Sequence, residues 1–395
     1  MQINQVNTLR HISKRSEAED FLRSILFTPY PVAIWRLPNQ GNINALVDLT
    51  MNEEPTNLEL ENLNKSFVIN SYHDSHPVKA ITLEGHILVK IEGSDAQLEV
   101  NPTLTGSQIE SFEGVLSNSL KLLKPGIKDG NHPDFESMVA EAIEKIKQGN
   151  LHKVVLSRYK DFELQESFDP IDTFDELTRS YPNAFCSLTN TKTYGLWIGA
   201  SPEKLIAIDN DRFFSTDALA GTQSLPSDKD LCDVAWTQKE IEEQAMVSRY
   251  IIDCFKKIRL REFDENGPKT VKAGNLAHLK TEYKVDMQAT SSPQLGSTML
   301  ELLHPTSAVC GAPRDLADDF IKSHEDYDRS LYAGFLGPVG FDSKTSLFVN
   351  LRCMQVIGNT ARLYAGAGIT EDSVPARELA ETDQKMETLL KVLGL

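Results

Sequence analysis

Paired strand-like segments joined by tight turns constrain the fold of this chain more than any other sequence feature. Three such pairs recur, each made of two short β-rich runs with turn-forming residues between them. They cover residues 186–200, residues 205–219 with a turn at 209–211, and residues 346–357 and 361–369 with a turn at Gly358 and Asn359. Strands joined by a tight turn pair antiparallel, so the sequence predicts antiparallel sheets. No Gly-x-Gly-x-x-Gly motif follows a strand, which argues against a dinucleotide-binding fold.

Helical patterns lie between these hairpins. Residues 134–148 carry apolar side chains at helical spacing, among them Phe135 and Met138, and Gly149 follows as a typical helix end. Further helices are predicted at residues 17–26, 237–258, 315–322 and 375–393, the last with a proline in its first turn. Strands from both halves of the chain, with helices packed outside them, indicate an α+β architecture.

The net charge limits the partners of the chain. Forty Lys and Arg residues face 57 Asp and Glu residues, which gives a net charge of −17 over 395 residues. Nucleic acids and anionic membranes bind positive surfaces, so we expect neither as a partner. An anionic substrate must be met by local cations or by a metal.

Signals for membrane insertion, export and disulfide formation are missing from the sequence. No apolar run of 18 residues is present, and the first residues lack a basic segment followed by an apolar one. The five cysteines are scattered and contain no Cys-x-x-Cys pair. These features predict a cytoplasmic protein with reduced, mostly buried cysteines.

Carboxylates on two predicted helices are candidate metal ligands. Glu243 shares a helical face with Val247 and Cys254, where a carboxylate costs energy unless it is paired or binds a metal. Glu378 and Glu381 are three residues apart on one face, a spacing at which two carboxylates can share a hard cation such as Mg²⁺. Simpler interpretations are the exposed end of an apolar stripe for Glu243, and a solvated helix face for Glu378 and Glu381.

Glycine-rich segments, an arginine and a histidine are candidate substrate contacts. The segments 219–222 and 365–369 lack side-chain bulk, which lets a ligand approach the backbone. Arg352 is predicted within one strand, residues 347–354, where it can bind a carboxylate with two hydrogen bonds. His304 precedes a proline, which favours an extended segment or a turn. Tight turns, an exposed strand cation and a structural histidine are the alternative interpretations.

Nine motifs occur in one order over roughly residues 132–390. They are His152-Lys-Val-Val-Leu-Ser-Arg158, Gly199-Ala-Ser-Pro-Glu-Lys-Leu205, Leu219-Ala-Gly-Thr222, residues 239–243, His304-Pro-Thr-Ser-Ala-Val-Cys-Gly-Ala-Pro313, Tyr332-Ala-Gly-Phe-Leu-Gly337, Leu351-Arg-Cys353, Ala365-Gly-Ala-Gly-Ile369 and Glu378-Leu-Ala-Glu-Thr-Asp-Gln-Lys385. In this order they resemble the chorismate-utilising enzyme family and, within it, the isochorismate synthases. Gln223 departs from the family pattern, in which a basic residue is common soon after Ala-Gly-Thr.

The resemblance implies a single large domain. In it, two antiparallel sheets form a sandwich with helices outside and the active site in a cleft. Residues 1–131 are expected to complete this sandwich, and residues 132–395 to form the chorismate-binding catalytic region. The boundary falls at the turn-forming run 125–133.

The resemblance also implies a reaction that depends on Mg²⁺. A water-derived hydroxyl is added at C2 of chorismate and the C4 hydroxyl is lost, which gives isochorismate. Lys153 matches the family's water-activating base, and Glu203 matches the acid that protonates the departing hydroxyl. Glu243, Glu378 and Glu381 match the carboxylates that hold Mg²⁺ against the ring carboxylate of the substrate. The matches to substrate-binding positions are Ala220, Gly221, Thr222, His304, Arg352, Gly366, Gly368 and Lys385.

Other functions share parts of this pattern. A salicylate synthase uses the same lysine and acid but goes on to eliminate pyruvate, and residues 306–311 are expected to decide between the two. An aminating enzyme is disfavoured by Lys153 and by the lack of a glutaminase module. An inactive scaffold is disfavoured by the retained acid, base and metal-site residues. The predicted pathway is menaquinone biosynthesis, with siderophore synthesis as the alternative, and we expect a monomer without a glutaminase subunit.

Overall fold

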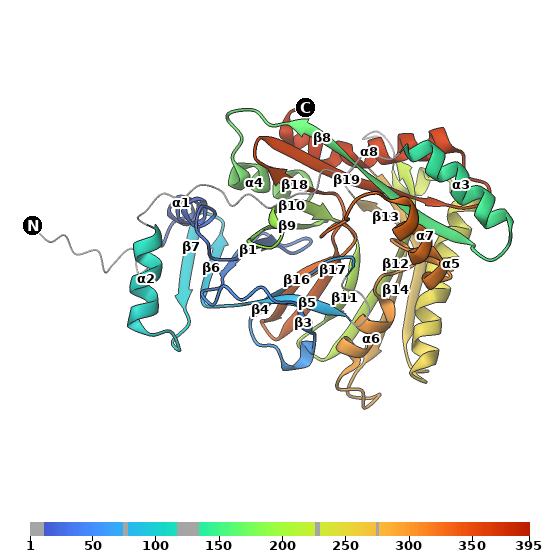
Figure 1. Cartoon of the computed structure of the whole chain (residues 1–395). Helices are drawn as coiled ribbons and strands as arrows, with labels where there is room; N and C mark the ends of the chain where they lie inside the picture. Colours follow the sequence, from blue (N-terminus) through green and yellow to red (C-terminus); the bar gives the residue numbers. More distant parts are fainter. Residues whose placement is uncertain (1–11, 74–77, 117–133, 226–229, 274–275) are drawn as a thin grey trace, which may run out of the picture.

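Two large antiparallel sheets form the centre of the computed structural model of the chain (Figure 1). The structure describes residues 12–73, 78–116, 134–225, 230–273 and 276–395. Neighbouring strands pair antiparallel throughout, from β1 with β2 to β6 with β7. The predicted α+β class with two antiparallel sheets is therefore confirmed. The predicted boundary at residues 125–133 lies outside the described residues.

The first sheet has ten strands. In spatial order they are β15 (Gly311–Ala312), β8 (Lys153–Glu163), β19 (Thr360–Ile369), β18 (Cys353–Ile357), β10 (Gly195–Ser201), β9 (Phe185–Thr191), β1 (Val32–Arg36), β2 (Ile43–Val47), β6 (Ile87–Glu92) and β7 (Asp95–Val100). The four N-terminal strands β1, β2, β6 and β7 thus extend the sheet formed by the strands that follow residue 150, because β1 pairs directly with β9.

The second sheet has nine strands. In spatial order they are β13 (Asp264–Ala273), β14 (Leu276–Asp286), β12 (Phe213–Ser224), β11 (Lys204–Ile208), β17 (Lys344–Val349), β16 (Phe335–Phe341), β4 (Ser66–Asn70), β5 (Lys79–Glu84) and β3 (Thr56–Asn57). Here β4 pairs with β16, so N-terminal and C-terminal strands are neighbours in this sheet as well.

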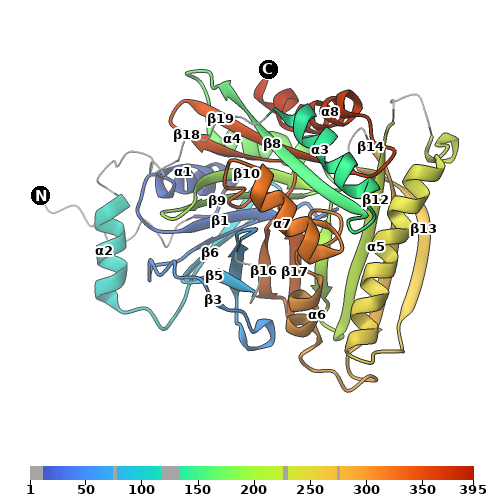
Figure 2. The same ribbon diagram turned by 45° about the vertical axis from the view of Figure 1, so that its right-hand side comes forward.

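Helices cover the outside of the two sheets (Figure 2). They are α1 (Arg15–Ile25), α2 (Gly106–Leu116), α3 (Phe135–Lys147), α4 (Pro170–Ser180), α5 (Gln238–Lys257), α6 (Leu295–Leu303), α7 (Arg314–His324) and α8 (Pro375–Leu393), with 3₁₀ turns at Leu60–Asn62 and Leu231–Asp233. Helix α8 packs on β19, and α5 packs on β12. None of the helices in the described ranges is long and apolar enough to cross a membrane.

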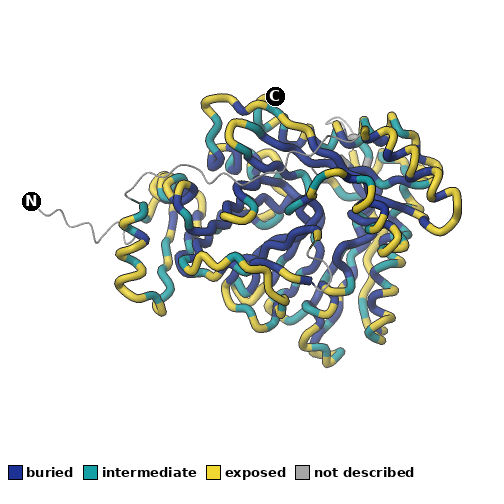
Figure 3. The backbone as a smooth tube through the Cα atoms, in the orientation of Figure 1, coloured by how far each residue is buried: buried dark blue, intermediate teal, exposed yellow. Residues whose placement is uncertain are grey.

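Aromatic side chains from both sheets meet in the core between them. The ring of Phe185 on β9 stacks on that of Phe348 on β17, with ring centroids 4.2 Å apart. Trp35 on β1 and Phe67 on β4 have centroids 5.1 Å apart. Figure 3 shows the same layering, with buried strands inside and exposed segments on the helices and loops. Because each buried aromatic removes a large apolar area from water, this contact ties the sheets together.

The chain passes from one sheet to the other at several short segments, among them residues 85–86 between β5 and β6, and we call two of the others the crossings. The first, residues 202–203, joins β10 to β11, and the second, residues 350–352, joins β17 to β18. The prediction of a single strand over residues 346–357 was therefore wrong. The backbone turns at Arg352, whose φ of 50° lies in the left-handed region and ends the extended run.

The two crossings lie against each other. The backbone N–H of Val349 donates to the carbonyl of Glu203 over 3.0 Å, and that of Ala200 donates to the carbonyl of Arg352 over 3.0 Å. The Ser201 hydroxyl donates to the Val349 carbonyl over 2.5 Å. Two antiparallel strand pairs, β10 with β18 and β11 with β17, thus bend together from one sheet into the other.

Candidate active site

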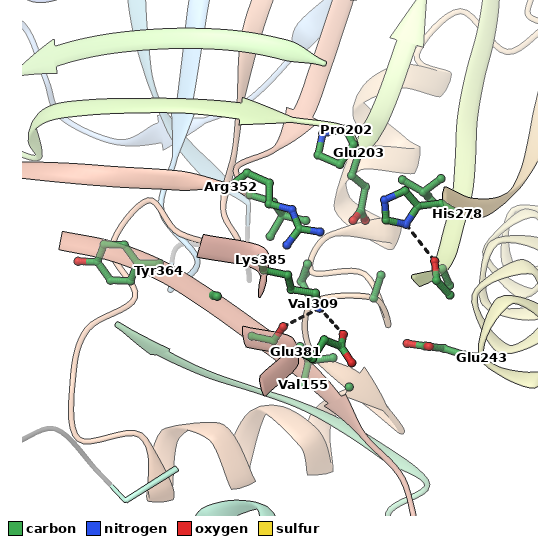
Figure 4. A pocket seen from close by; sticks show the side chains of 18 of the residues that line it. Val155, Pro202, Glu203, Glu243, His278, Val309, Arg352, Tyr364, Glu381 and Lys385 are labelled. Atoms are coloured by element: carbon green, nitrogen blue, oxygen red, sulfur yellow. Dashed lines mark hydrogen bonds and ion pairs between the residues drawn. The ribbon is translucent and has the colours of Figure 1, made fainter. Parts of the chain in front are cut away.

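A cavity opens beside the two crossings (Figure 4). Its walls come from both sheets, from α5 and from α8. They are formed by Val155, Pro202, Glu203, Leu219, Ala220, Gly221, Glu243, His278, Ala308, Val309, Tyr332, Leu351, Arg352, Tyr364, Ala365, Gly366, Gly368, Glu381 and Lys385. The cavity therefore combines acidic and basic side chains with a wall of small residues.

Glu203 lies on the first crossing and is only 7% exposed. Its carboxylate points into the cavity (Figure 4). Burial raises the pKa of this carboxyl to about 7, although Lys153, Arg352 and a hydrogen bond with Thr306 all favour the charged form. Near neutral pH a large share of Glu203 is therefore protonated, as a general acid must be.

Arg352 lies on the second crossing, and its guanidinium extends toward Glu203 (Figure 4). Within the described part of the chain, this guanidinium makes no hydrogen bond or ion pair. Burial lowers the pKa of Arg352, as expected for a cation removed from water. A half-buried guanidinium without a carboxylate partner is suited to receive an anion from outside the protein.

Lys153 begins β8 and is only 1% exposed. Lys153 is not part of the cavity wall, whereas Glu243 is. The two residues are linked, because Nζ of Lys153 donates to Oε1 of Glu243 over 2.8 Å. Burial opposes ionisation of Glu243, yet Lys153 outweighs it and the pKa of Glu243 is lowered. Gly368 makes room for this pair, because a Cβ there would lie 2.8 Å from Cε of Lys153 and 3.1 Å from Oε1 of Glu243.

Helix α8 presents Glu378, Glu381 and Lys385 to the same region. Oε1 of Glu378 lies 3.0 Å from Nζ of Lys239, which begins the first turn of α5. Lys385 pairs with Glu381 over 2.6 Å and donates to the Gly366 carbonyl over 2.8 Å. Burial opposes ionisation of Glu381, but Lys385 outweighs it and lowers the pKa.

The three glutamates fit a magnesium ion by chemistry but not by spacing. Carboxylate oxygens are the donors that Mg²⁺ prefers. Among the described residues, however, three possible ligand atoms come within 4.8 Å of one another only at Asp230, Cys232 and Asp233, which are exposed. The carboxylates of Glu243, Glu378 and Glu381 are instead each held by one lysine.

The structure places a different histidine at the cavity from the predicted one. His304 is fully buried, packs edge-on against Phe335 with ring centroids 4.9 Å apart, and is not part of the wall. His278 on β14 is part of the wall, and its Nδ1 lies 2.9 Å from the Gly221 carbonyl. Burial, reinforced by Arg352, lowers the pKa of His278 to about 4, so the ring is neutral at pH 7.

Most other predicted contacts lie together. Ala220, Gly221, Gly366 and Gly368 all belong to the cavity wall. The side chain of Thr222 lies outside the described residues. The sequence reasoning missed Tyr332 and Tyr364, which also belong to the wall and stack with ring centroids 5.6 Å apart. Tyr332 lies in a turn before β16 and Tyr364 lies within β19, and neither position carries a local sequence signal that separates a wall residue from a core residue.

Two antiparallel sheets, with an acid, a cation and small residues gathered where the chain crosses between them, define an enzyme-like site for a small anionic ligand. Residues 87–394 match the family described as chorismate binding enzymes. The chain therefore belongs to the chorismate-binding enzyme family. The family resemblance inferred from the nine motifs is thus confirmed.

Relatives within this family include isochorismate synthases. The chain is 30% identical to isochorismate synthase EntC of Escherichia coli over 66% of this chain and 67% of that protein. It is 32% identical to isochorismate synthase DhbC of Bacillus subtilis over 66% of this chain and 68% of that protein. The structure of MenF, the menaquinone-specific isochorismate synthase of Escherichia coli, matches with a TM-score of 0.74 at 24% identity over 94% of this chain and 91% of MenF. The match to the MenF structure supports the fold.

Proposed function

We propose that this protein is an isochorismate synthase, which converts chorismate to isochorismate with Mg²⁺ as its cofactor. The observation that carries the proposal is the buried Glu203, whose pKa of about 7 suits a general acid, facing a cavity with a guanidinium and two lysines nearby. The isochorismate synthases among the relatives support the same reaction.

In the proposed reaction, Glu203 and Lys153 move the two protons. Glu203 gives its proton to the C4 hydroxyl of chorismate, which leaves as water. Lys153, as a neutral amine, takes a proton from the water whose oxygen adds at C2. One water enters and one leaves, so the substrate is isomerised.

Chorismate carries two carboxylates, which need cationic partners in this acidic protein. We propose that Arg352 and Lys385 bind them, together with backbone amides near Gly221 and Gly368. Ala220, with its small side chain in the cavity wall, keeps bulk away from the ring. Mg²⁺, when held by Glu243, Glu378 and Glu381, supplies further positive charge toward the ring carboxylate.

The conversion of chorismate to isochorismate can serve either of two biosynthetic pathways. We propose menaquinone biosynthesis, supported by the sequence similarity to isochorismate synthase MenF of Bacillus subtilis, which is 30% identical over 66% of this chain and 55% of that protein. The sequence matches to EntC and DhbC keep siderophore synthesis as the alternative. Expression measured with and without iron separates the two, because a siderophore enzyme is induced by iron limitation and a menaquinone enzyme is not.

A product assay tests the proposed activity. We expect the purified protein with chorismate and Mg²⁺ to form isochorismate up to a limiting ratio, as separated by chromatography. Salicylate with pyruvate would instead identify a salicylate synthase, and unchanged chorismate with both Mg²⁺ and ammonia would refute the proposal.

A lysine variant tests the proposed base. Lys153→Ala should reduce the rate by at least about 10²-fold, the usual contribution of a positioned base, while Mg²⁺ binding persists. Lys160→Ala is the matched control, since Lys160 is on the same strand with a side chain 51% exposed, and its activity should be unchanged. Full activity of Lys153→Ala would exclude this residue as the base.

A further inference from the structure

Each candidate metal ligand is paired with one lysine in this structure. Glu243 pairs with Lys153 over 2.8 Å, Glu381 pairs with Lys385 over 2.6 Å, and Glu378 pairs with Lys239 over 3.0 Å. We call these the three Glu–Lys pairs. Each lysine contacts only Oε1 of its glutamate, so a metal that binds at one of these Oε1 atoms must displace the ammonium group and open that pair.

The three lysines differ in how readily each ammonium group can move away from its glutamate. The side chain of Lys153 is 2% exposed, so its ammonium group is enclosed by the protein. Lys385 is held by a second acceptor, the Gly366 carbonyl. Lys239 is 42% exposed and, within the described ranges, forms a hydrogen bond only with Glu378. Its position in the first turn of α5 lets the ammonium swing into water by rotation of its own side chain.

Glu378 cannot remain without a cation. Its side chain is 3% exposed, and a buried carboxylate that loses its partner is strongly destabilised. The charges of Glu378, Glu381 and Glu243 all act on Lys239, so its ammonium lies within the field of the whole acidic group. One mobile cation therefore neutralises the most buried ligand until another cation replaces it.

We propose that Lys239 is a built-in competitor of the metal, which occupies Glu378 in the metal-free enzyme and swings out when Mg²⁺ binds. This inference rests on the proposed function, because it takes the three glutamates as the metal ligands. It explains why they do not converge within 4.8 Å: each is held by its own lysine. Lys239 thus sets the affinity for the metal without itself being a ligand.

The exchange also adjusts the charge of the cavity. Before Lys153 gives up the proton it must lose to act as the base, and with Glu203 as the neutral acid, the charges of Lys153, Lys385 and Arg352 balance those of the three glutamates once Lys239 is in solvent. The divalent metal then supplies the only excess charge, equal and opposite to that of a dicarboxylate substrate. When no metal is bound and Lys239 still pairs with Glu378, the excess is one positive charge, half of that in the metal-bound state. Metal loading therefore prepares the cavity for a doubly charged ligand.

Titration of the metal-free protein with Mg²⁺ by calorimetry, without substrate, tests this inference. We expect Lys239→Gln to bind Mg²⁺ about fivefold to tenfold more tightly than the wild type, as for the loss of a competing ion pair of about 1 kcal/mol. Lys256→Gln is the matched control, because Lys256 is on the same helix and pairs with Asp253. It should bind Mg²⁺ like the wild type.

A double variant separates direct competition from the general loss of a positive charge. In a Glu378→Gln background the carboxylate that Lys239 guards is gone, so adding Lys239→Gln should leave Mg²⁺ affinity unchanged. Thermal melts give a second readout. Metal-free Lys239→Gln should melt below the wild type, because Glu378 is left unpaired, and Mg²⁺ should raise its melting temperature more than that of the wild type.

The outcomes distinguish this inference from the proposed function. Equal or weaker Mg²⁺ binding by Lys239→Gln, with a wild type that binds Mg²⁺ and converts chorismate, overturns the competitor role alone. An equal gain in affinity in the Glu378→Gln background also overturns it, because the effect would then be long-range. A wild type that neither binds Mg²⁺ nor converts chorismate overturns the proposed function itself.

Discussion

The environment of Glu203 shows which of two opposing effects decides the protonation of a buried acid. Two cations, Lys153 and Arg352, favour the carboxylate, whereas burial favours the neutral acid. Burial is the larger effect, and the pKa rises to about 7. Placing an acid on a crossing between two sheets achieves this, because both sheets shield it from water.

The raised pKa of Glu203 predicts how activity depends on pH. The acid works only when protonated, so the rate should fall as the pH rises through about 7, from the acidic side. Glu203→Gln should lose at least about 10²-fold in kcat and should lose this inflection too. Steady-state rates between pH 5.5 and 9 with a thermal melt of each variant provide the test. If the fall in rate on the alkaline side of the wild-type profile is also present in Glu203→Gln, that would contradict the role of Glu203 as acid.

At the level of single residues, the sequence supported roles only through the order of the nine motifs. Lys153 and Glu203 have no local signature, since one lysine in a strand resembles any other. His304 was predicted because it matches a family histidine within the motif 304–313, whereas His278 lies outside the nine motifs and has no local signal that marks it. The conformation of Arg352 was predicted wrongly because a left-handed residue between two β-rich runs leaves no mark on their alternation.

Among the elements, strands β8 and β19 meet along a seam of small residues beside the cavity. Gly366 pairs with Ser157 and Gly368 pairs with Val155 in this ladder. A Cβ at Gly366 would lie 2.8 Å from the Leu156 carbonyl and 2.9 Å from the Tyr332 hydroxyl. The two glycines therefore serve close packing, and the space they leave is filled by neighbouring side chains.

Substitution of Gly368 tests the importance of this seam. Gly368→Ala should lower activity by at least about tenfold, because the added methyl group displaces Lys153 from Glu243, and overpacking of this kind costs about 1–3 kcal/mol. Gly41→Ala is the control, since no atom lies within 4 Å of its added Cβ, and it should behave as the wild type. Steady-state kinetics and melting temperatures check both. Wild-type activity in Gly368→Ala would show that the seam tolerates a side chain.

Elements with strong periodicity or caps were predictable, and others were not. The helix at 134–148 corresponds to α3, capped by Asp134, whose side chain accepts from the backbone of Ser137. The strand predicted at residues 153–159 corresponds to β8, which continues to Glu163. Helix α4 was missed, although Asp169 at its N-cap and Pro170 in its first turn were visible in the sequence. The hairpin of β1 and β2 was missed as well, although Pro38, Asn39 and Gly41 between the two strands are typical turn residues.

In the whole molecule, the N-terminal strands are interleaved with the rest. The central strand β1 lies between β9 and β2, and β4 lies between β16 and β5. Removing the N-terminal part would expose the edges of β9 and β16, would take Trp35 and Phe67 out of the aromatic core, and would remove the contact of Trp35 with Phe341. These pairings could not be derived from the sequence, because they join segments far apart in the chain.

This interleaving predicts that residues 132–395 cannot fold alone. A fragment of residues 132–395 should show no cooperative unfolding transition and should not convert chorismate, whereas the full chain should show both. Circular dichroism during urea unfolding, with the product assay, checks this. A fragment that unfolds cooperatively and is active would show that the catalytic region is an independent domain.

The paired crossings give the chain a mechanical property. Glu203 and Arg352 lie on neighbouring segments whose backbones are hydrogen-bonded to each other, so the two sheets cannot slide without changing the distance between acid and cation. Because side chains alternate along a strand, one residue inserted in either crossing would turn one of these groups out of the cavity. The two crossings, five residues in all, must therefore keep their length for Glu203 and Arg352 to reach the cavity, while loops at the far ends of the sheets are free to vary in length.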